Sequence, residues 1–356
     1  MEIDESRHAG IARGGFALSH SNARSTVGSD REPRVRGRLA PSPTGSLHLG
    51  HARSFLIAWL AARRERGSIA LRIEDIDSTR VRPGATRAAI TDLAALGLDW
   101  DEGPDCGGFA APYVQSKRFE IYQEYLDRLI EYNYVYPCTC TRGDIERAAS
   151  APHAGDEPVR YPGTCSSRSA AEAVKLGVDS FAWRFRVRAG EIAWDDLVLG
   201  RRAIDLSRFG GDFVVARVDR AYGRFTPAYQ LAVTVDDALM RINRVVRGDD
   251  LVLSTPRQIA LYRAFQFSPP QFAHIPLGYD ESGRRLAKRD SSITVRSLLD
   301  RGADPRRLIG ALARECGLTN EIVPSRPADW IDRFELSEIP RDKWIVTSKF
   351  LQELVS

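Results

Sequence analysis

Residues 38–64, RLAPSPTGSLHLGHARSFLIAWLAARR, decide how the chain folds. The segment begins with a short apolar stretch and breaks at a turn rich in proline and glycine. After Gly50 its apolar residues recur at helical spacing, as at Leu56 and Leu60. A strand, a tight turn and a helix N-terminus in this order form the phosphate-binding geometry of a nucleotide-binding βα unit. The pattern therefore predicts an α/β fold with a parallel sheet and a nucleotide site at this turn.

His48 and His51 stand at the mouth of the turn, on either side of Gly50. Two imidazoles can reach phosphate oxygens, and a glycine between them lets a flat base lie close to the backbone. No carboxylate or third ligand accompanies them, so they suit a polyphosphate better than a metal. The alternative is that both histidines only cap and solvate the start of a helix, because short motifs often occur by chance.

The composition is that of an ordinary globular protein. The chain has 356 residues, of which 43% are hydrophobic and 28% charged, and a net charge of +4, which permits nucleic-acid binding without requiring it. It has no run of about 18 apolar residues, so we expect no membrane span. Five cysteines, an odd number, argue against a secreted disulfide scaffold. No secretory signal is visible, and we expect a cytoplasmic protein.

Hydrophobic periodicity and turn residues predict the other elements. Thr255 and Pro256 should be the N-cap and the first residue of one helix. Short alternating runs between residues 181 and 219 should form strands of an inserted subdomain. The strands outside that subdomain are expected at 68–73, 231–235 and 242–247, and the helices at 86–96, 116–132, 255–265, 295–301, 306–316 and from 349 onward.

Lys288 lies in a polar loop that contains glycine, residues 278–289, GYDESGRRLAKR. Lysine is rare in this chain, and a mobile lysine could close onto ATP phosphates and stabilise the charge that shifts toward pyrophosphate. The alternative is a solvated surface turn.

Three cysteines form another candidate site. Cys138 and Cys140 are separated by one residue, and Cys165 follows four residues after Tyr161. Three thiolates and one further donor could hold a zinc ion in tetrahedral geometry. The alternative is that they are reduced cysteines that pack as small hydrophobic residues.

The opening motif resembles a signature of the class I aminoacyl-tRNA synthetases. Residues 38–45, RLAPSPTG, with 48–51, HLGH, resemble the HIGH motif of the glutamyl branch. Residues 72–77, RIEDID, 229–233, YQLAV, and 246–251, VRGDDL, match the same branch, and the resemblance spans about residues 36–290. Residues 285–288, RLAK, resemble its second signature, KMSKS, in a degraded form. Arg285 replaces the first lysine and Ala287 replaces a serine, so only Lys288 carries over.

The resemblance implies a class I Rossmann-like fold and assigns roles to individual residues. His48, His51 and Lys288 would be catalytic and, with Gly50, would bind ATP, which Mg²⁺ accompanies. Glutamate has two carboxylates and one ammonium group, and a pocket with Arg38, Arg247 and Glu74 is its electrostatic complement. The full set of glutamate contacts that the resemblance implies is Arg38, Leu39, Ala40, Pro41, Ser42, Glu74, Tyr229 and Arg247.

Only residues 291–356 follow the Lys288 loop, too few for the large anticodon-binding region of a glutamyl-tRNA synthetase. The chain therefore resembles the small paralogues called glutamyl-queuosine tRNA(Asp) synthetases. In that family the anticodon loop enters the active site, and two cysteines, a tyrosine and a further cysteine bind one structural Zn²⁺. The matching residues here are Cys138, Cys140, Tyr161 and Cys165, with His153 as a rival fourth ligand.

These expectations define the domains and the reaction. We expect a leader at 1–34, a catalytic domain in two halves at 35–112 and 226–290, an inserted zinc-bearing subdomain at 113–225, and a helical tail at 291–356. The enzyme would form glutamyl-adenylate from L-glutamate and ATP, and pass the glutamyl group to queuosine in the anticodon loop of tRNA(Asp), acting as a monomer. The alternatives are a truncated enzyme that charges tRNA(Glu) and a non-catalytic RNA-binding relic.

Overall fold

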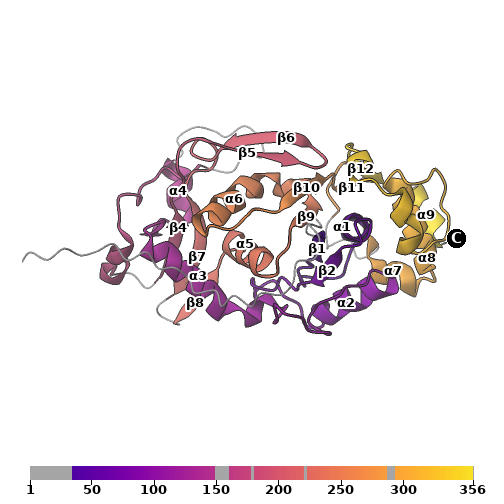
Figure 1. Ribbon diagram of the computed structural model, residues 1–356, viewed down its shortest axis with the longest axis horizontal. Coiled ribbons are helices and arrows are strands. Elements are labelled where there is room, and N and C mark those ends of the chain that lie inside the picture. The colour runs from indigo at the N-terminus through magenta and orange to yellow at the C-terminus, as the bar shows by residue number, and fades with distance from the viewer. Residues whose placement is uncertain (1–33, 149–159, 178–179, 220–222, 287–292, 356) are drawn as a thin grey trace, which may run out of the picture. The chain divides into compact units, whose positions relative to one another are not determined.

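The computed structural model describes residues 34–148, 160–177, 180–219, 223–286 and 293–355 (Figure 1). The leader predicted for residues 1–34 lies outside this part of the chain except for its last residue.

Two adjacent pairs of parallel strands, together called the parallel sheet here, bring together two halves of the chain that are far apart in sequence. β1 (Arg36–Leu39) pairs in parallel with β2 (Ser68–Leu71), and β9 (Arg244–Gly248) pairs in parallel with β10 (Gln271–Ile275). The backbone N–H of Asn243 donates to the Arg36 carbonyl at 3.1 Å and joins β9 to β1. The carboxyl ends of these strands therefore meet at one edge, where α/β sheets bind their ligands.

α1 (Leu49–Arg63) connects β1 to β2, and its predicted helical character is confirmed. Leu56 and Leu60 are completely buried and Phe55 is half-buried. The helix packs on β1 and β9 and also against α8 (Pro305–Glu315) and η5 (Pro327–Arg333), so it is buried on more than one side. This surrounding core fixes the end of α1 that carries His48 and His51.

In sequence, an antiparallel sheet of order β3-β4-β7-β8 lies between the two halves, and it ends two residues beyond the predicted inserted subdomain, at Pro227. The hairpin β5–β6 also falls in that range, but it joins the parallel sheet, because β5 pairs with β10 at Asp196 and Phe272. The elements of this stretch are η1 (Gln115–Lys117), α3 (Phe119–Glu131), β3 (Val135–Cys138), α4 (Arg142–Ala148), η2 (Ala170–Lys175), β4 (Ser180–Phe185), β5 (Glu191–Asp196), β6 (Gly200–Asp205), β7 (Phe213–Asp219) and β8 (Arg224–Pro227).

Two sequence predictions in the second half are wrong. Residues 231–235 were expected as a strand, but they lie in α5 (Tyr229–Leu239), where all five are buried. A helix that is buried on most sides shows no helical periodicity, so its apolar run cannot be told from a strand by pattern. The N-cap of α6 (Thr255–Ala264) is Ser254 rather than Thr255. The Thr255 hydroxyl instead accepts a hydrogen bond from Arg247, at 2.9 Å.

The C-terminal part is mostly helical, as predicted, and it packs on the parallel-sheet domain. It consists of α7 (Val295–Asp300), α8, η5, η6 (Leu336–Glu338), β12 (Trp344–Val346) and α9 (Ser348–Val355). β12 pairs in parallel with β11 (Gly278–Asp280). Arg53 of α1 donates to the Pro276 carbonyl at 2.9 Å, and its guanidinium lies 5.6 Å from the Trp344 ring centre. The tail is thus tied to the helix that begins at the predicted nucleotide site.

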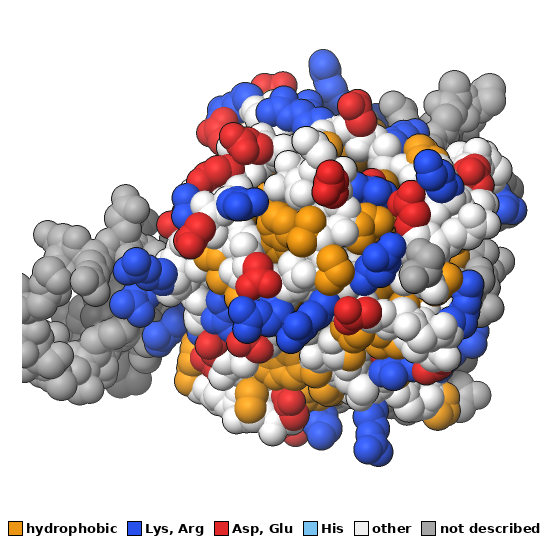
Figure 2. All heavy atoms as spheres, turned by 90° about the vertical axis from the view of Figure 1, so that its right-hand side faces the viewer, with side chains coloured by type: hydrophobic (Ala, Val, Ile, Leu, Met, Phe, Trp, Pro, Cys, Tyr) orange, Lys and Arg blue, Asp and Glu red, His pale blue; other side chains and the backbone are white. Residues whose placement is uncertain are grey.

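The surface seen in Figure 2 carries positive and negative side chains interspersed, with hydrophobic side chains between them. This face therefore has no large region of a single charge. Among the described residues, the helices are all too short or too polar to cross a membrane.

The predicted strand at 68–73 and helices at 86–96, 116–132, 295–301, 306–316 and from 349 agree with the structure to within a few residues. α2 (Ala85–Ala95), for example, follows β2 and contributes Leu93 to the core cluster that also contains Leu71 of β2.

Candidate active site

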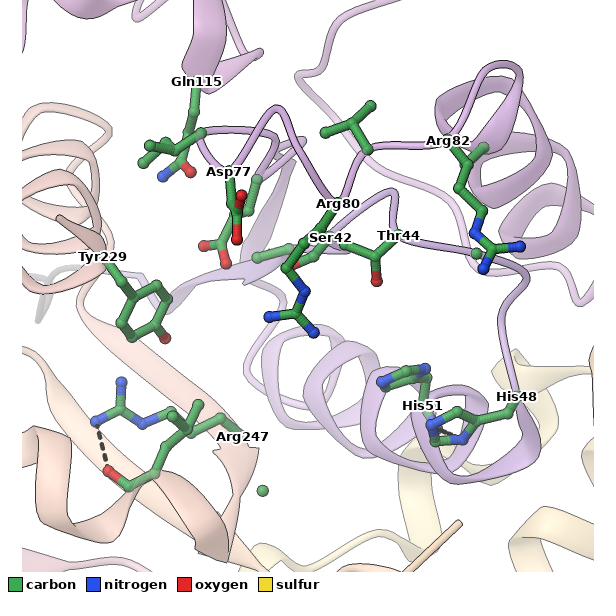
Figure 3. Close-up of a pocket in the computed structure, with 18 of the residues that line it drawn as sticks. Ser42, Thr44, His48, His51, Asp77, Arg80, Arg82, Gln115, Tyr229 and Arg247 are labelled. Atoms are coloured by element: carbon green, nitrogen blue, oxygen red, sulfur yellow. Dashed lines mark hydrogen bonds between the residues drawn. The ribbon is translucent and has the colours of Figure 1, made fainter. Parts of the chain in front are cut away.

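A cavity of about 1960 Å³ opens at the carboxyl ends of β1, β2 and β9. Its lining comes from the turn between β1 and α1, the loop after β2, the start of α5, the strands β7 and β8, and the loop after β11. Figure 3 shows side chains from the turn after β1, the loop after β2, the start of α5 and β9 around one space. Ligand pockets for one small molecule are usually about 300–1,000 Å³, so this cavity has room for more than one group.

His48 and His51 line the cavity at the start of α1 (Figure 3). His48 is the N-cap residue, and its Nδ1 atom accepts a hydrogen bond from the backbone N–H of His51 at 3.3 Å. The two rings stack with their centres 3.6 Å apart. His48 thus does cap the helix, as the simpler reading supposed, and the cap also orients its ring beside that of His51.

Gly50 does not line the cavity but supports the histidine pair. A Cβ atom at this position would lie 3.0 Å from Cε1 and 3.1 Å from Nδ1 of the His48 ring. The absence of a side chain therefore leaves room for the His48 ring, and the close approach of a base at Gly50 stays a prediction.

The strand β1 and the turn after it present alternate residues to the cavity. Arg38, Ala40 and Ser42 line it, whereas the Leu39 side chain is completely buried in the core. This is the two-residue alternation of an extended chain. The carbonyls of Leu39 and Pro41 accept hydrogen bonds from the backbone N–H groups of Arg72 and Glu74, so these two residues serve the strand pairing.

Arg38 and Arg247 are both buried at the cavity wall. Arg38 donates from Nη1 to the Val246 carbonyl at 2.9 Å, and its Nε lies 3.7 Å from the Asp237 carboxylate. Arg247 donates from Nη1 to Gln258 at 2.8 Å, in addition to its bond to Thr255. Burial lowers the pKa of Arg247.

Glu74 and Tyr229 complete this wall. Glu74 accepts a hydrogen bond of 2.9 Å from Arg72, which is itself completely buried. Burial raises the pKa of Glu74, and Arg72 and Arg38 oppose that rise. Tyr229 is the first residue of α5, and its side chain points into the cavity (Figure 3). The structure therefore brings Arg38, Glu74, Tyr229 and Arg247 together, although they are scattered through the sequence.

Below this wall lies a buried charge network that sequence reasoning missed. Arg72 pairs with Asp237 at 2.6 Å, and Asp236 accepts from Arg118 at 2.7 Å and from the Tyr122 hydroxyl at 2.9 Å. Asp236 and Asp237 lie in α5, which the sequence had suggested to be a strand up to residue 235. Once α5 is recognised as a helix, Asp236 and Asp237 are seen to lie on its buried side. Buried carboxylates are usually paired, so these two residues would have predicted buried cations nearby.

Lys288 lies outside the described residues. The loop that leads to it begins at the cavity, where Arg285 and Leu286 are part of the lining. Arg285 forms an ion pair of 2.8 Å with Asp250, which follows β9.

Other polar residues of the cavity were given no role from the sequence, although Asp77 lies in the motif at residues 72–77. The loop after β2 contributes Asp77, Arg80 and Arg82, and the antiparallel sheet contributes Arg217 and Thr226. The charged residues directly after β2 were a usable signal, because loops after the strands of an open α/β sheet bind ligands. No sequence signal marked Arg217, since it is one of many polar residues that alternate with apolar residues along a strand.

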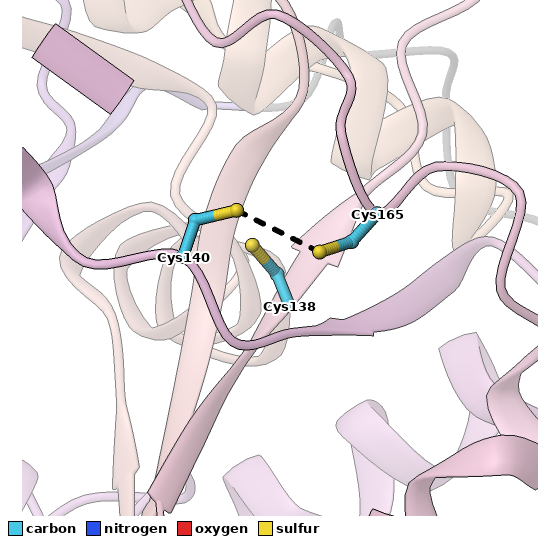
Figure 4. Close-up of side chains that lie close together, drawn as sticks. All are labelled: Cys138, Cys140 and Cys165. Carbon is cyan, nitrogen blue, oxygen red and sulfur yellow. Dashed lines mark hydrogen bonds between the residues drawn. The ribbon is translucent and has the colours of Figure 1, made fainter. Parts of the chain in front are cut away.

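The predicted cysteine site is assembled at the end of β3 (Figure 4). The sulfur atoms of Cys138, Cys140 and Cys165 all lie within 4.8 Å of one another, with Cys140 and Cys165 at 3.6 Å. Tetrahedral zinc with Zn–S bonds of about 2.3 Å separates its sulfur ligands by about 3.8 Å. The three thiols therefore fit a zinc ion in number, chemistry and spacing.

The surroundings of the cysteines offer a fourth oxygen donor. The Tyr161 hydroxyl lies 3.3 Å from the Cys138 sulfur and 3.9 Å from that of Cys140. Arg184 donates to the Cys138 sulfur at 3.3 Å and its guanidinium covers the Tyr161 ring at 3.9 Å. His153, the rival fourth ligand, lies outside the described residues.

Comparison with known proteins identifies the family. Residues 34–342 match the family model described as tRNA synthetases class I (E and Q), catalytic domain. The chain is 43% identical over 322 residues to a glutamyl-Q tRNA(Asp) synthetase of Nitratidesulfovibrio vulgaris. The aligned region covers 90% of this chain and 98% of that protein. It is 47% identical over 309 residues to the enzyme of the same name from Symbiobacterium thermophilum, covering 86% and 94% of the two chains.

A solved structure supports the same conclusion. The crystal structure of a glutamate-tRNA synthetase from Elizabethkingia anophelis superposes with a TM-score of 0.76 at 26% identity, over 90% of this chain and 69% of the other. The predicted fold class, a class I Rossmann-like α/β domain, is thereby confirmed. The chain belongs to the class I tRNA synthetases of the glutamate and glutamine branch, and within them to the glutamyl-Q tRNA(Asp) synthetase family.

Proposed function

We propose that this enzyme activates L-glutamate with ATP and transfers the glutamyl group to queuosine in the anticodon loop of tRNA(Asp). The observation that carries the proposal is the cavity wall in which Arg38, Arg247 and Glu74 meet. Two cations and one anion complement the two carboxylates and one ammonium group of glutamate. The near full-length match to two glutamyl-Q tRNA(Asp) synthetases supports queuosine as the acceptor.

The reaction has two steps. The α-carboxylate of glutamate attacks the α-phosphate of ATP, which forms glutamyl-adenylate and releases pyrophosphate. A hydroxyl of the cyclopentene ring of queuosine then attacks the activated carbonyl, which forms an ester and releases AMP. No protein nucleophile takes part, so catalysis consists of positioning and charge stabilisation.

The histidine pair and Lys288 serve the first step. His48 and His51 lie where a helix N-terminus and a Gly-containing turn can receive phosphates. Lys288 adds a positive charge to the phosphates when its loop closes, and Mg²⁺ accompanies the nucleotide. The start of that loop at the cavity, through Arg285 and Leu286, supports this role.

The remaining volume of the cavity suits a nucleoside of the RNA. Arg80, Arg82 and Arg217 line the part contributed by the loop after β2 and by β7. Arginine is well suited to phosphate because its planar guanidinium forms paired hydrogen bonds. These residues would hold the anticodon backbone while queuosine enters the cavity.

We further propose that Cys138, Cys140 and Cys165, with Tyr161 as fourth ligand, hold one structural zinc ion. Such an ion would join the end of β3 to the loop that carries Cys165. It supplies folding stability rather than chemistry, because a structural site has all four positions taken by protein ligands.

The same proposal includes a monomeric state and a cytoplasmic location. It also includes the predicted domain boundaries, at 35–112, 113–225, 226–290 and 291–356. Light scattering on a sizing column tests the monomer directly.

One assay tests the main proposal. Labelled glutamate and ATP are supplied with tRNA that contains queuosine and with the same tRNA lacking it. We expect label only on the queuosine-containing RNA, at its anticodon loop. Label on the terminal adenosine of queuosine-free tRNA(Glu) would favour the truncated charging enzyme, and no label on any RNA would favour a non-catalytic protein.

A further inference from the structure

His274 lies between an acid and an arginine that belong to neighbouring strands. Its Nδ1 atom is 2.5 Å from Oδ2 of Asp196, the last residue of β5, and its Nε2 atom is 3.1 Å from Nε of Arg247 in β9. β10 carries His274 between them because it pairs with β5 on one side and β9 on the other. Of the three residues, Arg247 alone lines the cavity.

The donor and acceptor roles in this chain follow from the chemistry of the groups. A guanidinium has only donors, so the Nε2 atom of His274 must accept from Arg247 and carries no proton. The proton of the neutral ring is therefore on Nδ1, which donates to Asp196. Burial lowers the pKa of His274, in agreement with a neutral ring. A protonated His274 would set two donors against each other and break the contact with Arg247.

Asp196 is held rigidly. Its Oδ1 atom accepts from the backbone N–H groups of Val198 at 3.1 Å, Leu199 at 3.0 Å and His274 at 3.1 Å. Its other oxygen takes the histidine proton, so both oxygens are committed. Burial alone would raise the pKa of Asp196, but the hydrogen bonds from His274 and the backbone outweigh burial and lower it to about 2. The carboxylate is thus ionised and cannot turn without losing several bonds.

Arg247 is the group that this arrangement orients. Its Nε–H is committed to His274, one Nη1–H to Gln258, and the Nη2 group to Thr255 and, at 3.4 Å, to the Leu251 carbonyl. These hydrogen-bond partners, all within the described part of the chain, are neutral, so none of them cancels the positive charge. The guanidinium is fixed in one plane, and its remaining Nη1–H is the donor left for a ligand at the cavity wall.

We propose that Asp196 and His274 are positioning residues that hold the Arg247 guanidinium in the orientation that binds a carboxylate of glutamate. The inference rests on the proposed function, because it names the group that the oriented cation receives. Asp196 sets the tautomer of His274, and that tautomer sets the direction of the Arg247 N–H groups. The hairpin β5–β6, which supplies Asp196, thereby takes part in substrate recognition although it contributes no residue to the cavity lining.

Two substitutions of His274 separate its contact with Asp196 from the contacts of its Nε2 atom, which lies 3.1 Å from the Arg247 Nε and 3.1 Å from the Thr255 hydroxyl. In His274→Gln the side-chain carbonyl can still accept from Arg247 Nε–H, but the link to Asp196 is lost. In His274→Asn the shorter amide can still donate to Asp196 but does not reach Arg247. In Asp196→Asn an amide NH₂ facing Nδ1 favours the opposite tautomer, which turns an N–H toward the Arg247 donor.

The measurement is glutamate-dependent ATP–pyrophosphate exchange with the full-length protein, with KM determined separately for glutamate and for ATP. We expect the glutamate KM to rise at least tenfold in His274→Asn and Asp196→Asn, less in His274→Gln, and the ATP KM to change less than twofold. Asp92→Asn is the matched control. Asp92 is also a fully buried carboxylate, and it pairs with Arg296 at 2.7 Å, but it does not line the cavity. The glutamate KM of this variant should therefore not change.

The outcomes are distinguishable. A glutamate KM within twofold of wild type in a folded His274→Asn variant overturns the positioning role, as do equal effects of His274→Gln and His274→Asn. Equal rises in the KM for glutamate and the KM for ATP point to a merely structural role and also overturn the positioning role. If Asp196→Asn does not fold, the two His274 variants decide. Absence of exchange in the wild-type protein overturns the proposed function, and with it this inference.

Discussion

The Arg38 guanidinium donates a 2.9 Å hydrogen bond to the carbonyl of Val246, a residue 208 positions further along the chain. The next residue, Arg247, presents its own guanidinium to the same cavity. The bond ties β1 to β9, so the position of one cation depends on the strand that carries the other. Two carboxylates of one small substrate can be bound only if two such cations keep a fixed separation.

Arg247 should dominate glutamate recognition. Replacing it with alanine should weaken glutamate activation by about 2–5 kcal/mol, as when one partner of a buried charge pair is removed. The measurement is kcat/KM for glutamate in pyrophosphate exchange. Arg244→Ala is the control, because this half-buried arginine of the same strand pairs with Gln271 and does not line the cavity. If exchange by Arg247→Ala were barely altered, the pocket assignment would be wrong.

Gly50→Ala should impair ATP use without unfolding the protein. The added methyl group would press on the His48 ring at 3.0 Å and displace it from its cap and from His51. We expect kcat/KM for ATP to fall at least tenfold while the melting temperature changes little. Gly177→Ala is the control, since a Cβ at that exposed glycine meets no atom within 4 Å. Normal activity of Gly50→Ala would show that the His48 position is unimportant.

Asp236→Ala should be strongly destabilising. The substitution leaves the buried Arg118 without its carboxylate partner, which typically costs about 3–5 kcal/mol. It also removes one of the three carboxylates around Arg72, which keeps Asp237 and Glu74. Urea unfolding measures the loss. Asp195→Ala removes the carboxylate of an exposed ion pair with Arg201, which should cost less than about 1 kcal/mol. Similar losses in the two variants would contradict the importance of the buried network.

Protein purified without chelators should contain about one zinc ion per chain by elemental analysis. Serine at Cys138, Cys140 or Cys165 should remove the metal, because each supplies a thiolate. Cys106→Ser, at an exposed cysteine, should retain it. Loss of zinc in Tyr161→Phe with retention in His153→Ala would identify the fourth ligand as tyrosine, and the reverse result as histidine. Full activity of protein free of zinc would refute the site.

Glutamate activation should proceed without RNA. Hydrogen bonds within the protein already hold Arg38 and Arg247 at the cavity wall, so the pocket needs no further organisation. We expect ATP–pyrophosphate exchange with glutamate alone, abolished in His48→Ala and strongly reduced in Lys288→Ala. Exchange that appears only after unmodified tRNA(Glu) is added would count against the queuosine assignment.

The sequence by itself determined the elements whose signals are local. The turn with Pro41, Gly45 and His48 specifies a strand, a turn and a helix start through backbone preferences of single residues. The pair Cys138 and Cys140, with Cys165 in reach, suggests a metal site because thiol chemistry is independent of the fold. The family resemblance added the residues of the proposed glutamate pocket, since its motifs span both halves of the chain.

Only the tertiary structure decided the rest. The run from Leu231 to Val235 is a helix because packing on most sides erases the periodicity that would have revealed it. Leu39 serves the core rather than the cavity because strand alternation points it away. The alignment of Asp196, His274 and Arg247 depends on the order of three strands. No local pattern encodes that order, because it arises from long-range pairing of segments that are distant in the chain.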